Sequence, residues 1–113
     1  MTILAIRAHR RFAVCRKARV SGAGRRAAEG LVIELSLDGC RISNVDPARF
    51  AIDQILRIAI EGAAAFDARV RWLGDRTLGL RFVEPLHVPA LDRLIRVCRG
   101  EEPGAAPARA YGT

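Results

Sequence analysis

Arginine, glutamate and serine stand in this chain at spacings suited to binding a planar, anionic ligand. Arg7 and Arg11 are four residues apart near the N-terminus, and Glu34 and Ser36 are two residues apart in an apolar run. The planar guanidinium of arginine forms paired hydrogen bonds with phosphate oxygens and guanine edges. Residues two apart in a strand point to the same face. A carboxylate and a hydroxyl would therefore share a face close to Gly39, which has no side chain to block a ligand.

The segment from Leu31 to Ser43 is typical of a β-hairpin, with apolar runs on both sides of Asp38 and Gly39. Asp-Gly between two apolar runs is a strong hairpin signal, because both central residues of a type I′ turn need positive φ. The sequence therefore predicts a tight type I′ turn at Asp38-Gly39, with the polar pair beside it.

The charge of the chain indicates an anionic partner. The formal net charge is +7, and Lys17 is the only lysine among 19 basic residues, so 18 are arginines. Nucleotides, nucleic acids and acidic proteins all fit such a surface. A GC-rich genome would also raise the arginine, alanine and glycine content without any functional demand.

Length and hydropathy predict a single domain in the cytoplasm. A chain of 113 residues that is 50% hydrophobic can form one packed core. No apolar run approaches the roughly 18 residues needed to cross a bilayer, and the N-terminus lacks the pattern of a secretory signal. We therefore expect no membrane insertion.

The cysteines and histidines show no metal-binding pattern. Three cysteines, Cys15, Cys40 and Cys98, are widely separated, and the only histidines are His9 and His87. Zinc sites need closely spaced pairs of such residues, so we expect reduced structural cysteines and no metal. No nucleophile is accompanied by a base and an orienting third group, which argues against an enzyme.

Short strands separated by turn signals predict an all-β fold, a small six-stranded antiparallel β-barrel with a C-terminal α-helix. The expected elements are an N-terminal basic arm, a barrel over residues 14–84, a helix over 88–99 and a flexible tail over 101–113, so that 1–100 form the domain and 1–13 the arm. The expected strands are 14–21, the hairpin 31–43, 54–60, 66–73 and 77–83, with a short helical turn at 48–51.

The predicted helix opens at Pro89 and carries an apolar stripe at helical spacing that should cap the barrel. The stripe consists of Leu91, Leu94, Ile95 and Cys98. Two aromatic residues on predicted strands, Trp72 and Phe82, are assigned to the core. With few aromatic residues in the chain, single-stranded nucleic acid is an unfavoured partner, because such proteins stack bases on aromatic rings.

The order of these motifs resembles the PilZ domain of bacterial cyclic di-GMP receptors. That family carries an RxxxR motif near the N-terminus and a [D/N]xSxxG motif on a strand and its turn. The segment Arg7-Ala-His-Arg-Arg11 fits the first motif, and Glu34-Leu-Ser36-Leu-Asp-Gly39 fits the second except that glutamate replaces aspartate or asparagine. Ala68–Trp72 and Leu78–Phe82 resemble the last two barrel strands of the family.

By this resemblance, the chain is a non-enzymatic receptor or adaptor for cyclic di-GMP. Arg7 and Arg11 would grip the phosphates and the O6/N7 edge of guanine, and Arg10 would replace either if the register shifts. Bidentate pairing of arginine with guanine contributes about 1–3 kcal/mol of discrimination. The arm would become ordered over the nucleotide and create a surface for an unidentified protein partner.

The remaining motif residues would read the opposite edge of guanine. The Glu34 carboxylate would accept hydrogen bonds from N1–H and from the N2 amino group, but it reaches about one bond length further than aspartate. Ser36 would contact the ligand or bond the hairpin backbone. Gly39 would be required by the turn in either case.

Two other functions remain open from the sequence. A degenerate PilZ-like adaptor would bind a protein and ignore the nucleotide, which the glutamate favours. A basic small barrel would bind nucleic acid through its phosphates, with a steep dependence on salt.

Overall fold

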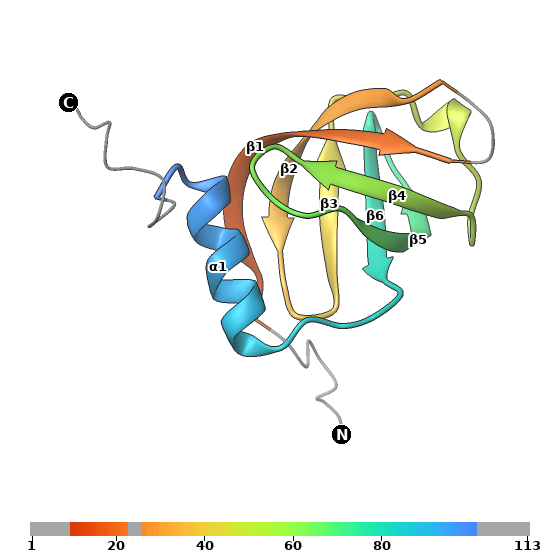
Figure 1. The fold of residues 1–113 in the computed structure, drawn as a ribbon. Coiled ribbons are helices and arrows are strands. Elements are labelled where there is room, and N and C mark those ends of the chain that lie inside the picture. The colour runs from red at the N-terminus through yellow and green to blue at the C-terminus, as the bar shows by residue number, and fades with distance from the viewer. Residues whose placement is uncertain (1–9, 23–25, 102–113) are drawn as a thin grey trace.

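In a computed structural model, residues 10–22 and 26–101 are described, and they form a closed antiparallel barrel with one helix beside it (Figure 1). This confirms the predicted fold. The elements in chain order are β1 (Phe12–Ser21), β2 (Ala28–Leu35), β3 (Gly39–Ser43), the short 3-10 helix η2 (Pro47–Arg49), β4 (Ile55–Ile60), β5 (Phe66–Leu73), β6 (Thr77–Phe82) and α1 (Val88–Cys98).

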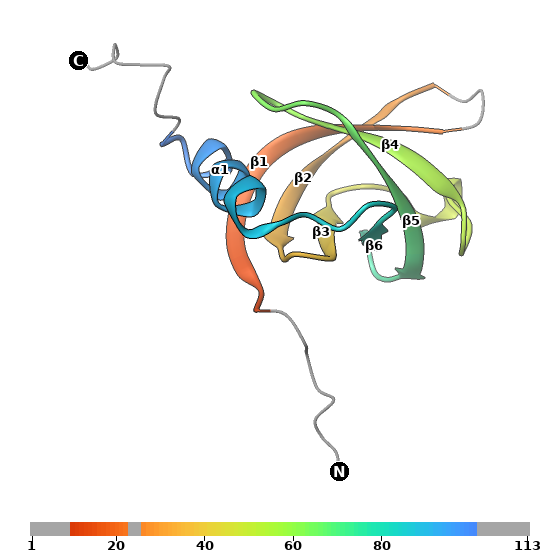
Figure 2. The same cartoon turned by 60° about the horizontal axis from the view of Figure 1, so that its bottom comes forward.

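The barrel closes in the order β1-β2-β3-β6-β5-β4, and each neighbouring pair of strands is antiparallel. The chain therefore leaves the β1–β2–β3 meander through η2, returns through β4 and β5, and ends with β6 beside β3. Because of this crossover, β3 of the predicted hairpin lies next to the last strand, β6, and β5 follows on the other side of β6 (Figure 2). The side chains on that outer side come from distant parts of the sequence.

The barrel interior is filled by alternate residues of each strand. In β4, for example, Leu56, Ile58 and Ile60 are buried while the residues between them face outward. Period-2 alternation of this kind is what a strand with one face in the core produces. The largest fully buried side chains are Leu35, Ile42, Leu56, Ile58, Ile60, Leu78, Val20, Val32 and Val70.

Helix α1 covers the part of the barrel formed by β1 and β2 (Figures 1 and 2). Its predicted stripe is buried and belongs to the core, as expected. Proline stands in its first turn, where the missing N–H costs nothing. At its C-terminal end, the Arg99 guanidinium donates to the backbone oxygen of Ala13 at 2.8 Å, which fixes the helix to β1.

The turn between β2 and β3 differs from the prediction. Neither Asp38 nor Gly39 has a positive φ, so this is not a type I′ turn. Gly39 is already the first residue of β3, opposite Arg81 of β6. A Cβ there would collide with the carbonyl oxygen of Leu80. Glycine is thus required for the close approach of β6, and not for the turn conformation predicted from the Asp-Gly pair.

Trp72 also differs from the prediction, whereas Phe82 lies in the core as expected. Strict alternation would place Trp72 inside with Ala68 and Val70, which are fully buried. The β5–β6 register shifts between Val70 and Trp72, a bulge that moves Trp72 to the outer face, where the residue is 43% exposed. A bulge reverses the facing of the residues that follow it.

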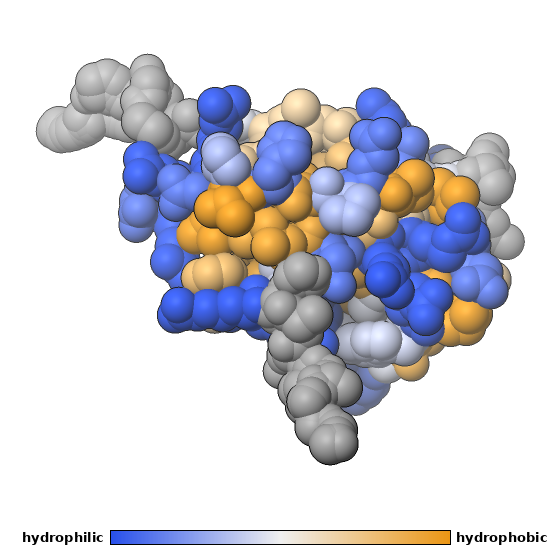
Figure 3. All heavy atoms as spheres, turned by 90° about the horizontal axis from the view of Figure 1, so that it is seen from below, coloured by the Kyte–Doolittle hydropathy of each residue, from blue (hydrophilic) through white to orange (hydrophobic). Residues whose placement is uncertain are grey.

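Among the described residues, no helix is both long enough and apolar enough to cross a membrane. Some hydrophobic side chains are nevertheless exposed on the surface. Val83 and Val88 are exposed in the link from β6 to α1 and at the start of the helix. That side of the molecule is seen in Figure 3, where hydrophobic surface gathers among hydrophilic side chains.

Candidate functional site

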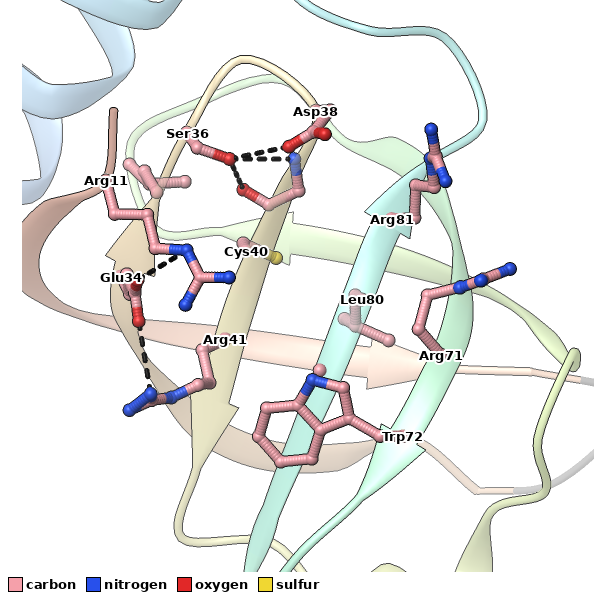
Figure 4. A pocket seen from close by; sticks show the side chains of 13 residues that line it. Arg11, Glu34, Ser36, Asp38, Cys40, Arg41, Arg71, Trp72, Leu80 and Arg81 are labelled. Carbon is pink, nitrogen blue, oxygen red and sulfur yellow. Dashed lines mark hydrogen bonds and ion pairs between the residues drawn. The ribbon is translucent and has the colours of Figure 1, made fainter. Parts of the chain in front are cut away.

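A hollow of about 200 Å³ lies on the outer face of the barrel, over β2, β3, β6 and β5. It collects both halves of the predicted site (Figure 4). The lining residues are Arg11, Glu34, Leu35, Ser36, Asp38, Gly39, Cys40, Arg41, Arg71, Trp72, Gly79, Leu80 and Arg81.

Strand register brings the polar side chains into one row. Glu34 of β2 lies opposite Arg41 of β3, Arg41 lies opposite Gly79 of β6, and Gly79 lies opposite Trp72 of β5. Side chains directly opposite each other on one face are close enough to interact. The row therefore joins a carboxylate, a guanidinium and an indole across four strands.

Glu34 is paired with two arginines. Its Oε2 lies 3.3 Å from Nε of Arg11, and its Oε1 lies 3.2 Å from Nη1 of Arg41. The Glu34 side chain is only 18% exposed, whereas those of Arg11 and Arg41 are 50% and 37% exposed. The carboxylate thus holds both guanidiniums at the rim of the hollow (Figure 4).

Ser36 organises the loop between β2 and β3. Its hydroxyl donates to Oδ1 of Asp38 at 2.9 Å and accepts from the backbone N–H of Gly39 at 3.2 Å. The residue is buried, and these bonds satisfy its polar atom. The loop is tied further to the segment after β6, since the N–H of Leu86 donates to the Leu37 oxygen at 2.8 Å. Its backbone is therefore rigidly placed at the end of the hollow.

Trp72 lies over a glycine. A Cβ at Gly79 would collide with the indole, so only glycine allows the ring to lie against the strand at this position. The guanidinium carbon of Arg41 is 5.9 Å from the indole centroid, within the range of a cation–π contact. The ring forms one wall of the hollow and offers a surface on which a planar base can stack (Figure 4).

The lining carries an excess of positive charge. Four arginines, Arg11, Arg41, Arg71 and Arg81, face two carboxylates, Glu34 and Asp38. In a partly enclosed hollow, such an imbalance favours an anion more than it would on a flat surface.

Four of the six residues predicted for the site line the hollow: Arg11, Glu34, Ser36 and Gly39. Arg10 does not, because its guanidinium carbon lies 4.9 Å from the centroid of the Phe12 ring. Arg7 lies outside the described residues. What these residues bind stays a prediction.

Sequence reasoning missed four side chains on β3, β5 and β6 that line the hollow. Arg41, Arg71, Arg81 and Trp72 line the hollow, but none of them is predicted from the sequence as a binding residue. For Trp72, the following Gly79 is the only signal that could have suggested an outward indole, since aromatic rings are often placed over strand glycines. Each of the three arginines has an outward position in its strand. Many other arginines of the chain share this property, so it could not have singled these three out as lining residues.

The cysteines are free, and Cys40 lies under the hollow. Burial raises the pKa of the Cys40 thiol strongly, with a smaller contribution from Cys98. Burial is also the main reason that the pKa of Cys98 is raised to about 11. Both are protonated near neutral pH and are not nucleophiles. In the part of the chain that the structure describes, no three histidine, cysteine or acidic residues come together as a metal site would require.

Comparison with known proteins identifies the family of the chain. A family model described as the PilZ domain matches residues 5–100. The chain belongs to the PilZ domain family. Comparison of this PilZ protein with curated proteins gave no match.

Two solved structures are similar to this PilZ domain. One is the Bacillus subtilis inhibitor of motility, MotI/DgrA, with a TM-score of 0.63 and 18% identity over 82% of this chain and 49% of that chain. The present chain thus spans about half of that protein. The other is the PilZ domain of CeSA from a cellulose-synthesizing bacterium, with a TM-score of 0.61 and 19% identity over 82% of this chain and 98% of that chain. At these identities the similarity concerns the fold.

Proposed function

We propose that this PilZ protein is a non-enzymatic receptor for cyclic di-GMP, with the hollow as its binding site. The observation that carries the proposal is the convergence of Arg11, Glu34 and Trp72 on one positively charged hollow. A guanidinium, a carboxylate and an aromatic face are the groups that bind a phosphate, a guanine edge and a base plane, respectively. Family membership supports the same ligand.

In the proposed complex, a guanine stacks on Trp72 and its phosphodiester contacts Arg11. Glu34 accepts hydrogen bonds from the N1–H and N2 amino groups. Because Glu34 already pairs with Arg11 and Arg41, the ligand shares or replaces these contacts. Ser36 and Gly39 act through the backbone of the loop, which Ser36 holds in place.

We further propose that the N-terminal arm, with Arg7 and Arg10, closes over the bound nucleotide. Arg11 directly precedes β1 at the rim of the hollow, so a contact between Arg11 and a phosphate would draw the preceding residues toward the ligand. The resulting surface would differ from that of the free protein, which is how a domain without an active site can signal to a protein partner.

Titration calorimetry with cyclic di-GMP at physiological salt tests the proposal, with GTP as the control nucleotide. We expect saturable binding at micromolar affinity or tighter, and no response to GTP, which has one guanine and no cyclic phosphodiester. A matched variant, Arg19→Ala, lies outside the hollow and should bind like the wild type. Absence of heat from concentrated, folded protein would contradict the proposal.

One observation favours a second function, that of a protein-binding adaptor that ignores the nucleotide. Both rim arginines already have Glu34 as an ion-pair partner, with which a phosphate would have to compete. Val83 and Val88 also expose 50% and 66% of their surface near one end of the barrel. If cyclic di-GMP does not bind, substitution of both valines by serine should abolish capture of the partner without lowering the melting temperature.

A further inference from the structure

The arginines of the hollow fall into two groups with different electrostatic surroundings. Arg11 and Arg41 are paired with Glu34 on one side of the hollow. Arg71 and Arg81 are exposed on the other side and have no acidic partner among the described residues. Figure 4 shows Arg71 and Arg81 on neighbouring strands, with Glu34 across the hollow from both. The excess positive charge of the site is therefore concentrated at β5 and β6.

Strand register increases this concentration. Arg81 of β6 lies directly opposite Arg69 of β5, and its other neighbour is Gly39 of β3, which brings no carboxylate. Nη1 of Arg69 donates a hydrogen bond to the backbone oxygen of Asp53 at 3.1 Å. Like charges directly opposite each other destabilise a sheet. An anion between the arginines would remove this repulsion.

The bulge in β5 brings Trp72 to the outer face beside Arg71. The bulge inserts Arg71 between Val70, which pairs with Leu80, and Trp72, which pairs with Gly79. Arg71 faces outward, as Arg69 does, and lies between the indole and the Arg69–Arg81 pair. A phosphate held there would be next to a base stacked on Trp72.

We propose that Arg71 and Arg81 form a second anion subsite that binds a phosphate or phosphodiester group. The inference deepens the proposed function, on which it rests for the identity of the natural ligand. The hollow measures about 200 Å³, below the roughly 300–1,000 Å³ typical of pockets that enclose a whole ligand. A cyclic dinucleotide therefore fills the hollow from side to side, and its charged groups need partners besides Arg11 and Arg41, which Glu34 already pairs.

Two sources could supply this phosphodiester: the second phosphodiester of the same nucleotide, or a second nucleotide. The first gives one nucleotide per protein, and the second gives two. Stoichiometry separates them, as described below.

The subsite itself is tested with inorganic pyrophosphate, independently of any nucleotide. Titration followed by NMR of arginine Nε–H groups should give saturable shifts at Arg71 and Arg81. Arg93 on the exposed face of α1 serves as the internal control and should not respond in this way. No saturable shift at Arg71 and Arg81, or equal shifts at all exposed arginines, would overturn the proposal.

The link to cyclic di-GMP is tested with the double variant R71Q/R81Q against R19Q/R93Q, which removes the same charge outside the hollow. In calorimetry we expect R71Q/R81Q to bind at least about 10-fold more weakly than R19Q/R93Q, with a smaller dependence on salt. One nucleotide per protein in wild type and variant indicates a single ligand that bridges the Glu34 side of the hollow and the subsite. A change from two nucleotides per wild-type protein to one per R71Q/R81Q variant indicates that the subsite binds a second nucleotide.

Equal affinities of the two double variants for cyclic di-GMP would overturn the assignment of the subsite. If wild-type protein does not bind cyclic di-GMP at all, the proposed function fails, and the pyrophosphate titration still decides whether the subsite exists. Circular dichroism of both double variants checks that each is folded.

Discussion

Two hollows on the outer surface of the described barrel differ in charge, and the larger of the two is not the better candidate for a ligand. The second measures about 460 Å³, against about 200 Å³ for the first, and lies over β4, β1 and β2. Its lining residues are Lys17, Ala18, Arg19, Glu29, Gly30, Leu31, Asn44, Ala59, Ile60 and Glu61. It contains no aromatic ring, and its two basic residues face two acidic residues.

Cross-strand pairing explains this difference. In the second hollow Arg19 lies directly opposite Glu29, and their side chains approach to 3.4 Å. In the first, Arg81 lies opposite Arg69, so the register places like charges together. Exposed ion pairs such as Arg19–Glu29 contribute little and attract no ligand. Charge balance, more than volume, distinguishes a binding site from a depression in the surface.

The largest effect should come from Arg11→Ala. The change removes a phosphate contact and leaves Glu34 with one cationic partner, so affinity for cyclic di-GMP should fall by more than about 100-fold in calorimetry. Arg19→Ala in the second hollow should have no effect. Strong binding by Arg11→Ala would show that the two hollows have been assigned the wrong roles.

Trp72→Ala should weaken binding by about 10- to 100-fold, because base stacking contributes about 1–3 kcal/mol. Trp72→Phe keeps an aromatic face and should lose less. Trp72 is the only tryptophan, so its fluorescence reports directly on the first hollow. A ligand that binds without changing this fluorescence would be placed in another part of the molecule.

Glu34→Asp should leave affinity unchanged or raise it by up to about 10-fold. The shorter carboxylate can no longer span Arg11 and Arg41 as Glu34 does, so both guanidiniums become available for phosphate. Glu29→Asp is the matched change in the second hollow and should leave the affinity for cyclic di-GMP unchanged. Loss of binding in Glu34→Asp would mean that the longer side chain is needed to contact the ligand.

The smallest expected effect is on the alkylation of Cys40, which lies under the first hollow. The thiols of Cys40 and Cys98 have raised pKa values, so little thiolate is present at pH 8. Exposed Cys15 should therefore be alkylated first, and mass spectrometry should find the other two modified only in denaturant. Rapid modification of Cys40 with ligand bound would show that the barrel opens beneath the nucleotide.

Local patterns in the sequence predicted most of the fold. The alternation in residues 66–73 matches the bounds of β5, and the apolar stripe after Pro89 matches the buried face of α1. The sequence predicts the start of β2 at Leu31, three residues later than its actual start at Ala28, because Glu29 and Gly30 interrupt the apolar run. Glu29 faces outward, and Gly30 allows a close approach to the Ser43 oxygen. Such exceptions depend on neighbours that are distant in the chain.

The sequence by itself determined the elements and the order of the short motifs, because strand alternation, helical spacing and turn residues are local properties. Only the tertiary structure decided which strands became neighbours. Closure of the barrel placed β6 and β5 beside the β2–β3 hairpin, and one bulge turned Trp72 outward to join Arg41. The charge balance of a surface depends on which side chains face each other across strands, and the register of distant strands sets this.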